Sequence, residues 1–360
     1  MKRPKATVNR RDLLRLRGIA SDARVVSPAV DPSTADGPVD AGYDLIKASR
    51  TAMASFFEIR LAAQAPGAIG LATRALDLID ELEGQLTVYR DDSEVSRLNA
   101  SAHLGPVEVE PGLFHLLERA VAIGDATGGA YDVTAGALSI AWGFFKGPKR
   151  VPDPEVLASA RARTGQHHLR LDPERRTIAF DREGIVINLG SIGKGYAIDQ
   201  AVDLIRGHWW PTPALVHGGQ SSLFALGSPP GRLGGRWPVA LRNPFDPTTP
   251  LGVLRLRNRG LGTSGTAFQH FEVDGRVYGH ILDPRTGEPA FGPASVTVVA
   301  PTAAEADALS TAFYLLGPER AAAYIETHPS VGAIFVTEGP ADGSPNVQAI
   351  GLSEQDFVPE

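Results

Sequence analysis

The sequence contains no cysteine in its 360 residues. This absence excludes disulfide bonds, thiolate metal sites, cysteine nucleophiles and an N-terminal lipid anchor attached through cysteine. Any metal ion must therefore be held by oxygen or histidine ligands, a donor set that favours a hard cation such as Mg²⁺.

Long hydrophobic runs are also missing, because no stretch approaches the ~18 apolar residues of a membrane-spanning helix. We therefore expect no membrane span. The N-terminus contains a twin arginine, Arg10 and Arg11, as in export signals read by that pair. Charged residues interrupt the segment that follows, so it lacks the apolar run of about 7–15 residues that an export signal needs. We interpret residues 1–42 as a degenerate twin-arginine signal or basic tail followed by a flexible linker, and the missing run favours the cytoplasm over export.

An excess of positive charge is absent as well. The chain has 35 Lys and Arg against 41 Asp and Glu, a formal charge of −6 and a pI near 5.9. This balance offers no basic surface for nucleic acid, so no nucleic-acid partner is expected. Hydrophobic content of 43% is that of an ordinary globular protein, and the 39 glycines and 28 prolines predict many connecting loops.

The order of the expected elements indicates an α+β fold with mixed or antiparallel sheets and packed helices. Segments 48–63 and 295–300 have the composition of strands, and "HFEVDGRVYGHILD" predicts a hairpin with an Asp-Gly turn. Helical spacing occurs in "LATRALDLIDELEGQL", "GLFHLLERAVAIGDATGG" and "GYAIDQAVDLIRGHW". Because helices and hairpins do not alternate regularly, a doubly wound parallel sheet is not expected.

The stretch "EADALSTAFYLLG", residues 305–317, predicts a helix with an unusual polar pair. Thr302 and Glu305 form a capping box, and an apolar stripe recurs at helical spacing. Asp307 and Thr311 lie four residues apart and so share one helix face. That face is either a partly solvated surface or a pair of hard oxygen ligands for a metal ion.

Two glycine-rich segments are candidate binding loops. "GGAYDVTAG" at 128–136 is either a helix stop with Asp132 as a cap or part of a site. "NLGSIGKGYAID" at 188–199 places Ser191 and Lys194 among glycines at a strand-to-helix junction, where backbone amides and a lysine favour phosphate. It is neither a Walker loop nor a dinucleotide fingerprint.

Two further polar segments follow. "TSG" at 263–265 is by itself a turn signal. "GHILDPRTGEP" at 279–289 joins His280 to Asp283 and a Pro-Arg-Thr-Gly turn. A histidine three residues from an aspartate at a strand end suits proton transfer, although Asp-Pro also commonly begins a turn.

Taken together, the segments resemble the ApbE family, the FAD:protein FMN transferases. "YRDDSEVSRLN", "GGAYDVTAGALSIAWGF", "INLGSIGKGYAID", "ALVHGG", "GLGTSG", "HILDPRTGEP" and "SVTVVAPTAAEADALSTAFYLLG" occur in the order and approximate spacing of that family. The resemblance begins near Met53, and it implies one ApbE-like domain over residues 43–355. The implied fold is α+β, with two lobes around a flavin-binding cleft.

The resemblance implies a Mg²⁺-dependent enzyme that moves FMN from FAD onto a threonine or serine hydroxyl of an acceptor flavoprotein and releases AMP. Two alternatives share the fold: a FAD pyrophosphatase that forms FMN and AMP, and a flavin-binding protein without catalysis. Position by position, the implied metal contacts are Ser191, Asp307 and Thr311, and His280 is the implied activator of the acceptor hydroxyl, with Asp283 as the next candidate. The positions matching FAD contacts are Met53, Tyr89, Ala130, Tyr131, Asp132, Asn188, Lys194 and Leu282.

The chain departs from the family pattern at several of these places. Asn188 stands where members usually have aspartate, and Gln220 follows "GG" where an acidic residue or asparagine is common. "TSGTAF" replaces the usual "TSGDYR", and Ser310 replaces an acidic residue found in some members.

Overall fold

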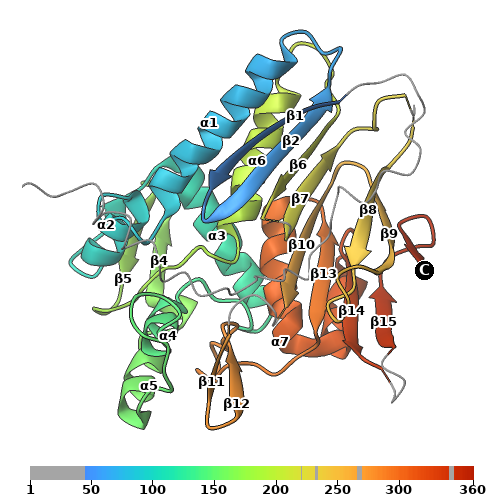
Figure 1. Ribbon diagram of the computed structural model, residues 1–360. Coiled ribbons are helices and arrows are strands. Elements are labelled where there is room, and N and C mark those ends of the chain that lie inside the picture. The colour runs from blue at the N-terminus through green and yellow to red at the C-terminus, as the bar shows by residue number, and fades with distance from the viewer. Residues whose placement is uncertain (1–44, 220, 232–233, 266–269, 340–343) are drawn as a thin grey trace, which may run out of the picture.

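A computed structural model describes residues 45–219, 221–231, 234–265, 270–339 and 344–360 (Figure 1). The interpretation of residues 1–42 and the departures at Gln220 and after Gly265 lie outside these residues. In the described part, no helix is long and apolar enough to cross a membrane.

The centre of the molecule is an eight-stranded sheet in which every neighbouring pair is antiparallel (Figure 1). This agrees with the predicted α+β class and excludes a doubly wound sheet. The strand order is β1-β2-β6-β7-β10-β13-β14-β15. The bounds are β1 Leu45–Ala52, β2 Ser55–Ala62, β6 Ala214–Gly218, β7 Ser222–Leu226, β10 Arg259–Gly265, β13 Ser295–Ala300, β14 Gly332–Glu338 and β15 Pro345–Ile350.

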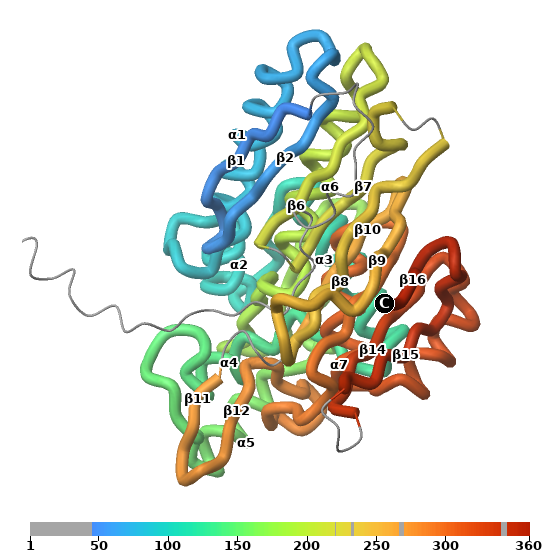
Figure 2. Tube along the Cα trace, turned by 45° about the vertical axis from the view of Figure 1, so that its right-hand side comes forward, coloured from blue at the N-terminus to red at the C-terminus, as the bar shows by residue number. Residues whose placement is uncertain are grey.

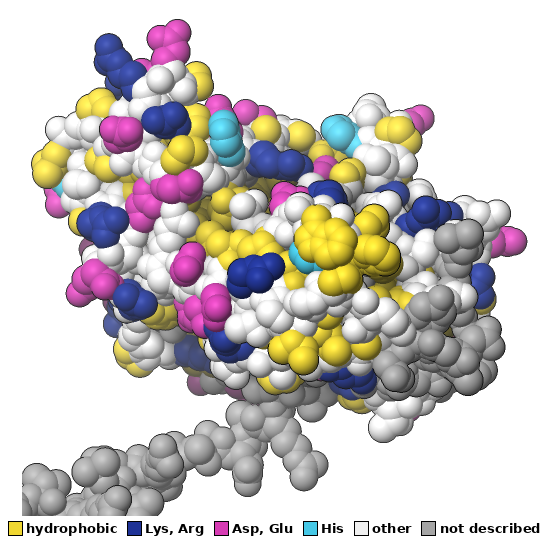
Figure 3. Space-filling view, turned by 90° about the horizontal axis from the view of Figure 1, so that it is seen from above, with side chains coloured by type: hydrophobic (Ala, Val, Ile, Leu, Met, Phe, Trp, Pro, Cys, Tyr) yellow, Lys and Arg dark blue, Asp and Glu magenta, His cyan; other side chains and the backbone are white. Residues whose placement is uncertain are grey.

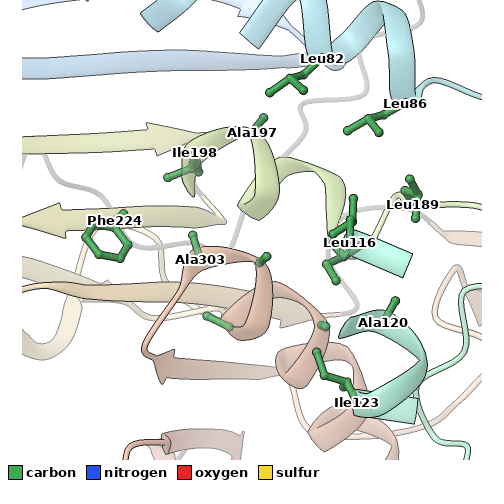
Figure 4. Close-up of a cluster of buried hydrophobic side chains, with 14 of the residues drawn as sticks. Leu82, Leu86, Leu116, Ala120, Ile123, Leu189, Ala197, Ile198, Phe224 and Ala303 are labelled. Carbon is green, nitrogen blue, oxygen red and sulfur yellow. The ribbon is translucent and has the colours of Figure 1, made fainter. Parts of the chain in front are cut away.

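Helices cover one face of this sheet and enclose the larger core. Apolar residues at helical spacing in α1, such as Leu71, Ala75 and Ile79, are fully buried against the strands. Figure 4 shows side chains of α1, α3 and α6 meeting Phe224 of β7 and Ala303 of α7 in this core. The bounds are α1 Ala68–Leu86, α3 Pro111–Ala126, α6 Gly193–Arg206 and α7 Ala303–Thr327.

A small sheet covers the opposite face, in the order β16-β9-β8. Trp237 and Leu254 from this sheet pack against Leu215 and Leu261 of the large sheet in a second core. No strand was predicted in this region, because its short apolar runs are interrupted by proline and glycine. The bounds are β8 Trp237–Arg242, β9 Pro250–Leu256 and β16 Phe357–Pro359.

The remaining elements lie near the C-terminal end of α1 (Figures 1 and 2). Among them is the predicted hairpin, which is confirmed as β11 His270–Val273 and β12 Arg276–Gly279 around Asp274 and Gly275. The others are α2 Glu94–Ser101, β3 Val107–Glu108, α4 Gly136–Ala141, α5 Pro154–Arg161, a 3₁₀ turn at Gln166–His168, β4 Leu169–Asp172 and β5 Thr177–Phe180.

One expectation about local structure was wrong in detail. The segment 48–63 is two strands, not one, because the chain reverses at Met53 and Ala54, whose φ angles are 49° and 53°. Neither residue favours this left-handed conformation, so no turn could be predicted there from residue type. Within α7, Gly317 has a non-helical φ of 75°, so the helix predicted over residues 305–317 does end there, and a second helical segment continues to Thr327.

Two glycines let α7 approach its neighbours backbone to backbone. A Cβ atom at Gly195 of α6 would lie 2.3 Å from the carbonyl oxygen of Ala303, and one at Gly262 of β10 would lie 2.4 Å from the backbone of Ala306. No side chain fits at these distances without displacing α7. The first turns of α7 are thereby held close to both α6 and β10.

Charges on the outer surface are mixed in sign. Figure 3, a view from above, shows Lys and Arg side chains interspersed with Asp and Glu, together with exposed hydrophobic groups. This face carries no basic stripe of the kind that binds a nucleic-acid backbone.

Candidate active site

One cavity of about 1010 Å³ brings together residues from across the chain. Its wall is formed by the β1–β2 turn, the loop after α1, the segments 130–145 and 188–194, the end of β10, residues 280–282 with Pro284, and one face of α7. All but one of the predicted site residues line it; the exception is Asp283. Those lining it are Met53, Tyr89, Ala130, Tyr131, Asp132, Asn188, Ser191, Lys194, His280, Leu282, Asp307 and Thr311.

Asp307 lines the cavity, and its side chain is buried. One oxygen, Oδ1, accepts a hydrogen bond from Ser222 Oγ at 2.6 Å, and Oδ2 accepts from the Gly195 backbone N–H at 2.8 Å. Burial raises the pKa of Asp307, while the charge of Lys194 and the two hydrogen bonds oppose that rise. The carboxylate therefore has a cation and two donors around it and free lone pairs for a further cationic ligand.

Hydroxyl groups gather one turn further along α7. Ser264 Oγ of β10 lies 3.2 Å from Thr311 Oγ1 and 2.8 Å from Ser310 Oγ. Ser310 Oγ also donates to the carbonyl oxygen of Asp307 at 2.8 Å. The serine at position 310 thus joins the hydroxyl cluster to the Asp307 backbone.

The segment 130–132 forms another part of the wall. Tyr131 is almost fully buried, and its hydroxyl makes no hydrogen bond of normal geometry within the described residues. Burial raises the pKa of this phenol, and the neighbouring Ser191 hydroxyl opposes the rise. The carboxylate of Asp132 is used by the fold, since it accepts from Thr134 N at 2.8 Å and from Gln166 N at 2.9 Å. Asp132 therefore holds the loop through a turn and a link to the 166–168 segment, and it is not the cap of α4, whose N-cap residue is Ala135.

The glycine-rich segment before α6 presents Asn188 and Lys194 to the cavity. Asn188 Oδ1 accepts from the Gly190 backbone N–H at 2.9 Å, which shapes the loop. Lys194 is the second residue of α6, so its ammonium group lies near the helix N-terminus. A lysine and exposed amides at a helix start favour a bound phosphate.

Met53 and Tyr89 stand on the β1–β2 turn and the loop after α1. Met53 occupies the left-handed turn described above, a conformation that costs free energy and that often occurs at functional sites. Tyr89 is 69% exposed, and its ring packs edge-on against Phe145 with centroids 5.1 Å apart. An exposed aromatic ring in the wall suits stacking on a planar ligand.

His280 and Asp283 have different surroundings, because His280 lines the cavity and Asp283 does not. His280 follows β12, lines the cavity and packs edge-on against Phe144, with centroids 6.5 Å apart. Asp283 instead binds Arg285, accepting from Nε at 2.8 Å and from Nη2 at 2.7 Å. Burial raises the pKa of Asp283, but its hydrogen bonds with Arg285 and the charge of that residue outweigh burial and lower it overall. Asp283 is therefore placed to hold the turn, and His280 to face the cavity.

Comparison with known proteins gives a consistent result. The sequence model of the ApbE family matches residues 53–335. The chain belongs to the ApbE family. It is 35% identical over 272 residues to the FAD:protein FMN transferase of Treponema pallidum, covering 72% of this chain and 75% of that protein. It is 32% identical over 252 residues to the enzyme of the same name from Escherichia coli K12, covering 68% and 70%.

Solved structures of ApbE proteins share the fold. The ApbE protein of Thermotoga maritima superposes with a TM-score of 0.76 at 27% identity, covering 84% of this chain and 96% of that one. The flavin transferase ApbE of Vibrio cholerae gives a TM-score of 0.75 at 26% identity, covering 86% and 98%.

In this ApbE family member, two residues outside the predicted set, Ser222 and Asp199, hold the site in place. Ser222 donates to Asp307, but a serine at the start of a short strand carries no sequence signal. Asp199 of α6 accepts from the backbone N–H groups of Ala303 and Ala304, at 2.8 and 2.9 Å. Burial raises its pKa to about 7 despite these hydrogen bonds. Asp199 belongs to the glycine-rich segment "NLGSIGKGYAID". Its role could not be predicted, because its hydrogen-bond partner Ala303 lies 104 residues away in the sequence.

The donor set fits the cation implied by the ApbE resemblance. Among the described residues no three His, Asp or Glu side chains form a metal-binding group. The ligands that the family resemblance implies on this wall are one carboxylate, Asp307, and the hydroxyls of Ser191 and Thr311. Mg²⁺ commonly takes one or two carboxylates and keeps several waters, so this set suits it and does not suit a cation that needs a full protein cage.

Proposed function

We propose that this protein is a Mg²⁺-dependent FAD:protein FMN transferase. The observation that carries the proposal is the joint placement of Asp307, Lys194 and His280 around one cavity of about 1010 Å³. The names of its relatives, FAD:protein FMN transferase in each case, support the same reaction.

The residues divide into three groups by the chemistry they supply. Asp307, Thr311 and Ser191 would hold Mg²⁺, which neutralises pyrophosphate charge and orients the phosphorus for in-line attack when it is bound. Lys194 binds a phosphate oxygen from the start of α6. Tyr89, Met53 and Leu282 provide apolar contacts for the planar parts of FAD.

His280 accepts the proton of the attacking hydroxyl. A serine or threonine oxygen of the acceptor forms a bond to the phosphorus of the FMN half. The bond between that phosphorus and the bridging oxygen breaks, and AMP leaves with the bridging oxygen and its electron pair. A neutral imidazole at the cavity wall is suited to this general-base role near pH 7.

One incubation separates transfer from the two alternatives. The protein is mixed with FAD, Mg²⁺ and a candidate acceptor, and AMP is measured by chromatography while protein-bound flavin is measured by in-gel fluorescence. Transfer gives equal amounts of AMP and bound flavin. A FAD pyrophosphatase would give AMP and free FMN without bound flavin, and a non-catalytic binder would give neither product.

A further inference from the structure

The β11–β12 hairpin leads directly into His280 and has one edge that no strand of the described residues pairs with. The two strands form a sheet of their own, and in Figures 1 and 2 no other strand lies beside them. Both turn residues, Asp274 and Gly275, have positive φ, at 52° and 75°, as in a two-residue type I′ turn. Such a turn fixes which backbone groups point inward and which point outward.

The pairing register gives the direction of each group. Val273 and Arg276 flank the turn and bond to each other, so the pair Glu272 and Val277 is a non-hydrogen-bonded pair. The alternation continues with Phe271 bonded to Tyr278. The N–H and C=O groups of Val277 and of Gly279 therefore point away from β11. Within the described residues no hydrogen bond to these groups is found.

The rest of the hairpin is held in place. Phe271 and Tyr278 stack with centroids 5.3 Å apart, and both rings lie against Trp142, at 6.5 and 5.5 Å. On the β11 side, Lys149 Nζ donates to the carbonyl oxygen of His270 at 3.2 Å. The hairpin thus has one face fixed on the body, one edge contacted by a side chain, and the β12 edge open.

The open edge ends at the cavity. Beyond His280 the chain is paired again, because the Ala290 N–H donates to the Ile281 carbonyl at 2.8 Å and Leu282 forms a bridge with Pro289. A strand added along Val277 and Gly279 cannot continue past His280. Its next residue would lie at the level of the His280 imidazole. A Cβ atom at Gly279 would meet nothing within 4 Å, so the face of the hairpin at this residue is not covered by another side chain or backbone of the described residues.

We propose that the acceptor protein binds as an extended segment added to the edge of β12, which brings its serine or threonine hydroxyl to His280. This inference rests on the proposed transferase function and names how the protein substrate is recognised. Main-chain hydrogen bonds to Val277 and Gly279 hold the segment, as in other cases of strand addition. The acceptor residue that receives FMN should therefore lie in a flexible segment or in an exposed edge strand, and not inside a helix.

Two matched proline variants test the inference. Val277→Pro removes an outward N–H of β12, and Glu272→Pro removes an outward N–H of β11, so neither takes a hydrogen bond from the hairpin ladder. The probe is a pool of synthetic peptides of about ten residues, at the upper end of strand length, each with one central threonine. Peptide-bound flavin and AMP are measured with FAD and Mg²⁺, and FAD affinity is measured by calorimetry.

We expect Val277→Pro to lower kcat/KM for the peptides about tenfold, the scale of one lost backbone hydrogen bond plus obstruction. Glu272→Pro should stay within about twofold of wild type, and both variants should bind FAD normally. Equal efficiencies of the two variants, whether normal or reduced, would overturn the inference, because the effect would then not belong to the β12 edge. If the wild-type protein releases AMP without labelling any peptide, the transferase proposal itself fails and the inference falls with it.

Discussion

The carboxylate of Asp307 on α7 accepts a hydrogen bond from the backbone N–H of Gly195 on α6, at 2.8 Å. The reverse contact also exists, since Asp199 on α6 accepts from the N–H groups of Ala303 and Ala304 at the start of α7. Each helix therefore supplies the carboxylate that satisfies free N–H groups in the first turn of the other. The predicted metal ligand is at the same time part of the contact that joins the two helices.

This double role makes the choice of substitution at Asp307 decisive. We expect Asp307→Asn to fold normally, because the amide oxygen can still accept from Gly195 and the amide nitrogen can donate to Ser222. Without its charge the variant should lose Mg²⁺-dependent turnover of FAD. Asp307→Ala should lose turnover and also lower the free energy of unfolding by about 1–3 kcal/mol, because two buried donors lose their acceptor. Denaturant unfolding and AMP release measure the two effects separately. Normal turnover by Asp307→Asn in Mg²⁺ would contradict the metal assignment.

Lys194 should contribute to the affinity for FAD. Lys194→Met keeps the length of the side chain and removes a charge-assisted hydrogen bond, so we expect binding to weaken by about 1–3 kcal/mol. Isothermal titration calorimetry with FAD measures this loss. Lys47→Met, at an exposed position of β1 outside the cavity, is the matched control and should bind as wild type does. Unchanged affinity in Lys194→Met would show that the ammonium group does not contact the cofactor.

His280 and Asp283 should respond differently to the same kind of change. We expect His280→Asn to bind FAD almost normally while turnover falls about 10²–10⁴-fold, the usual contribution of a general base. Asp283→Asn should keep most of its turnover and unfold at lower temperature, because it loses charged hydrogen bonds to Arg285. Single-turnover kinetics and thermal unfolding of both variants test this assignment. The reverse outcome, with a stability loss at 280 and a turnover loss at 283, would move the base to Asp283.

Asp199 should give the stability a characteristic dependence on pH. Its pKa is raised from 3.8 to about 7 in the folded protein, so folding favours the protonated form. Its stabilising contribution is complete below pH about 4 and is lost as pH rises through about 7. We expect the free energy of unfolding of wild type to fall more over this range than that of Asp199→Asn, as measured by denaturant unfolding at each pH. A rise with pH in wild type alone would mean that the two backbone hydrogen bonds outweigh burial.

The sequence predicted features that depend on local spacing. Asp307 and Thr311 share a helix face because they are four residues apart, and the Asp-Gly pair at 274 and 275 specified the hairpin. The N-cap at Thr302 was also correct, since Thr302 Oγ1 accepts from Glu305 N at 3.2 Å, whereas the Glu305 carboxylate pairs with Arg119 and does not complete the capping box. These features need no knowledge of what packs against them.

Features that depend on distant partners were not visible. Ser222 gave no signal because its role comes from Asp307, which is 85 residues away. The left-handed turn at Met53 and Ala54 lacks the glycine or asparagine that normally marks it, and tertiary contacts must supply the free energy that this turn costs. The site residues themselves were named through family resemblance, because composition could not relate segments so far apart.

The position of β1 bears on how this protein could be tethered. Leu45 pairs with Ala62 at one end of the strand, and Met53 at the other end lines the cavity. Eight strand residues at about 3.3 Å each separate these points by about 25 Å. A surface, resin or fusion partner joined directly to Leu45 in place of residues 1–44 would therefore attach well away from the opening through which FAD and a bulky second protein must enter, and immobilised enzyme should retain access to both.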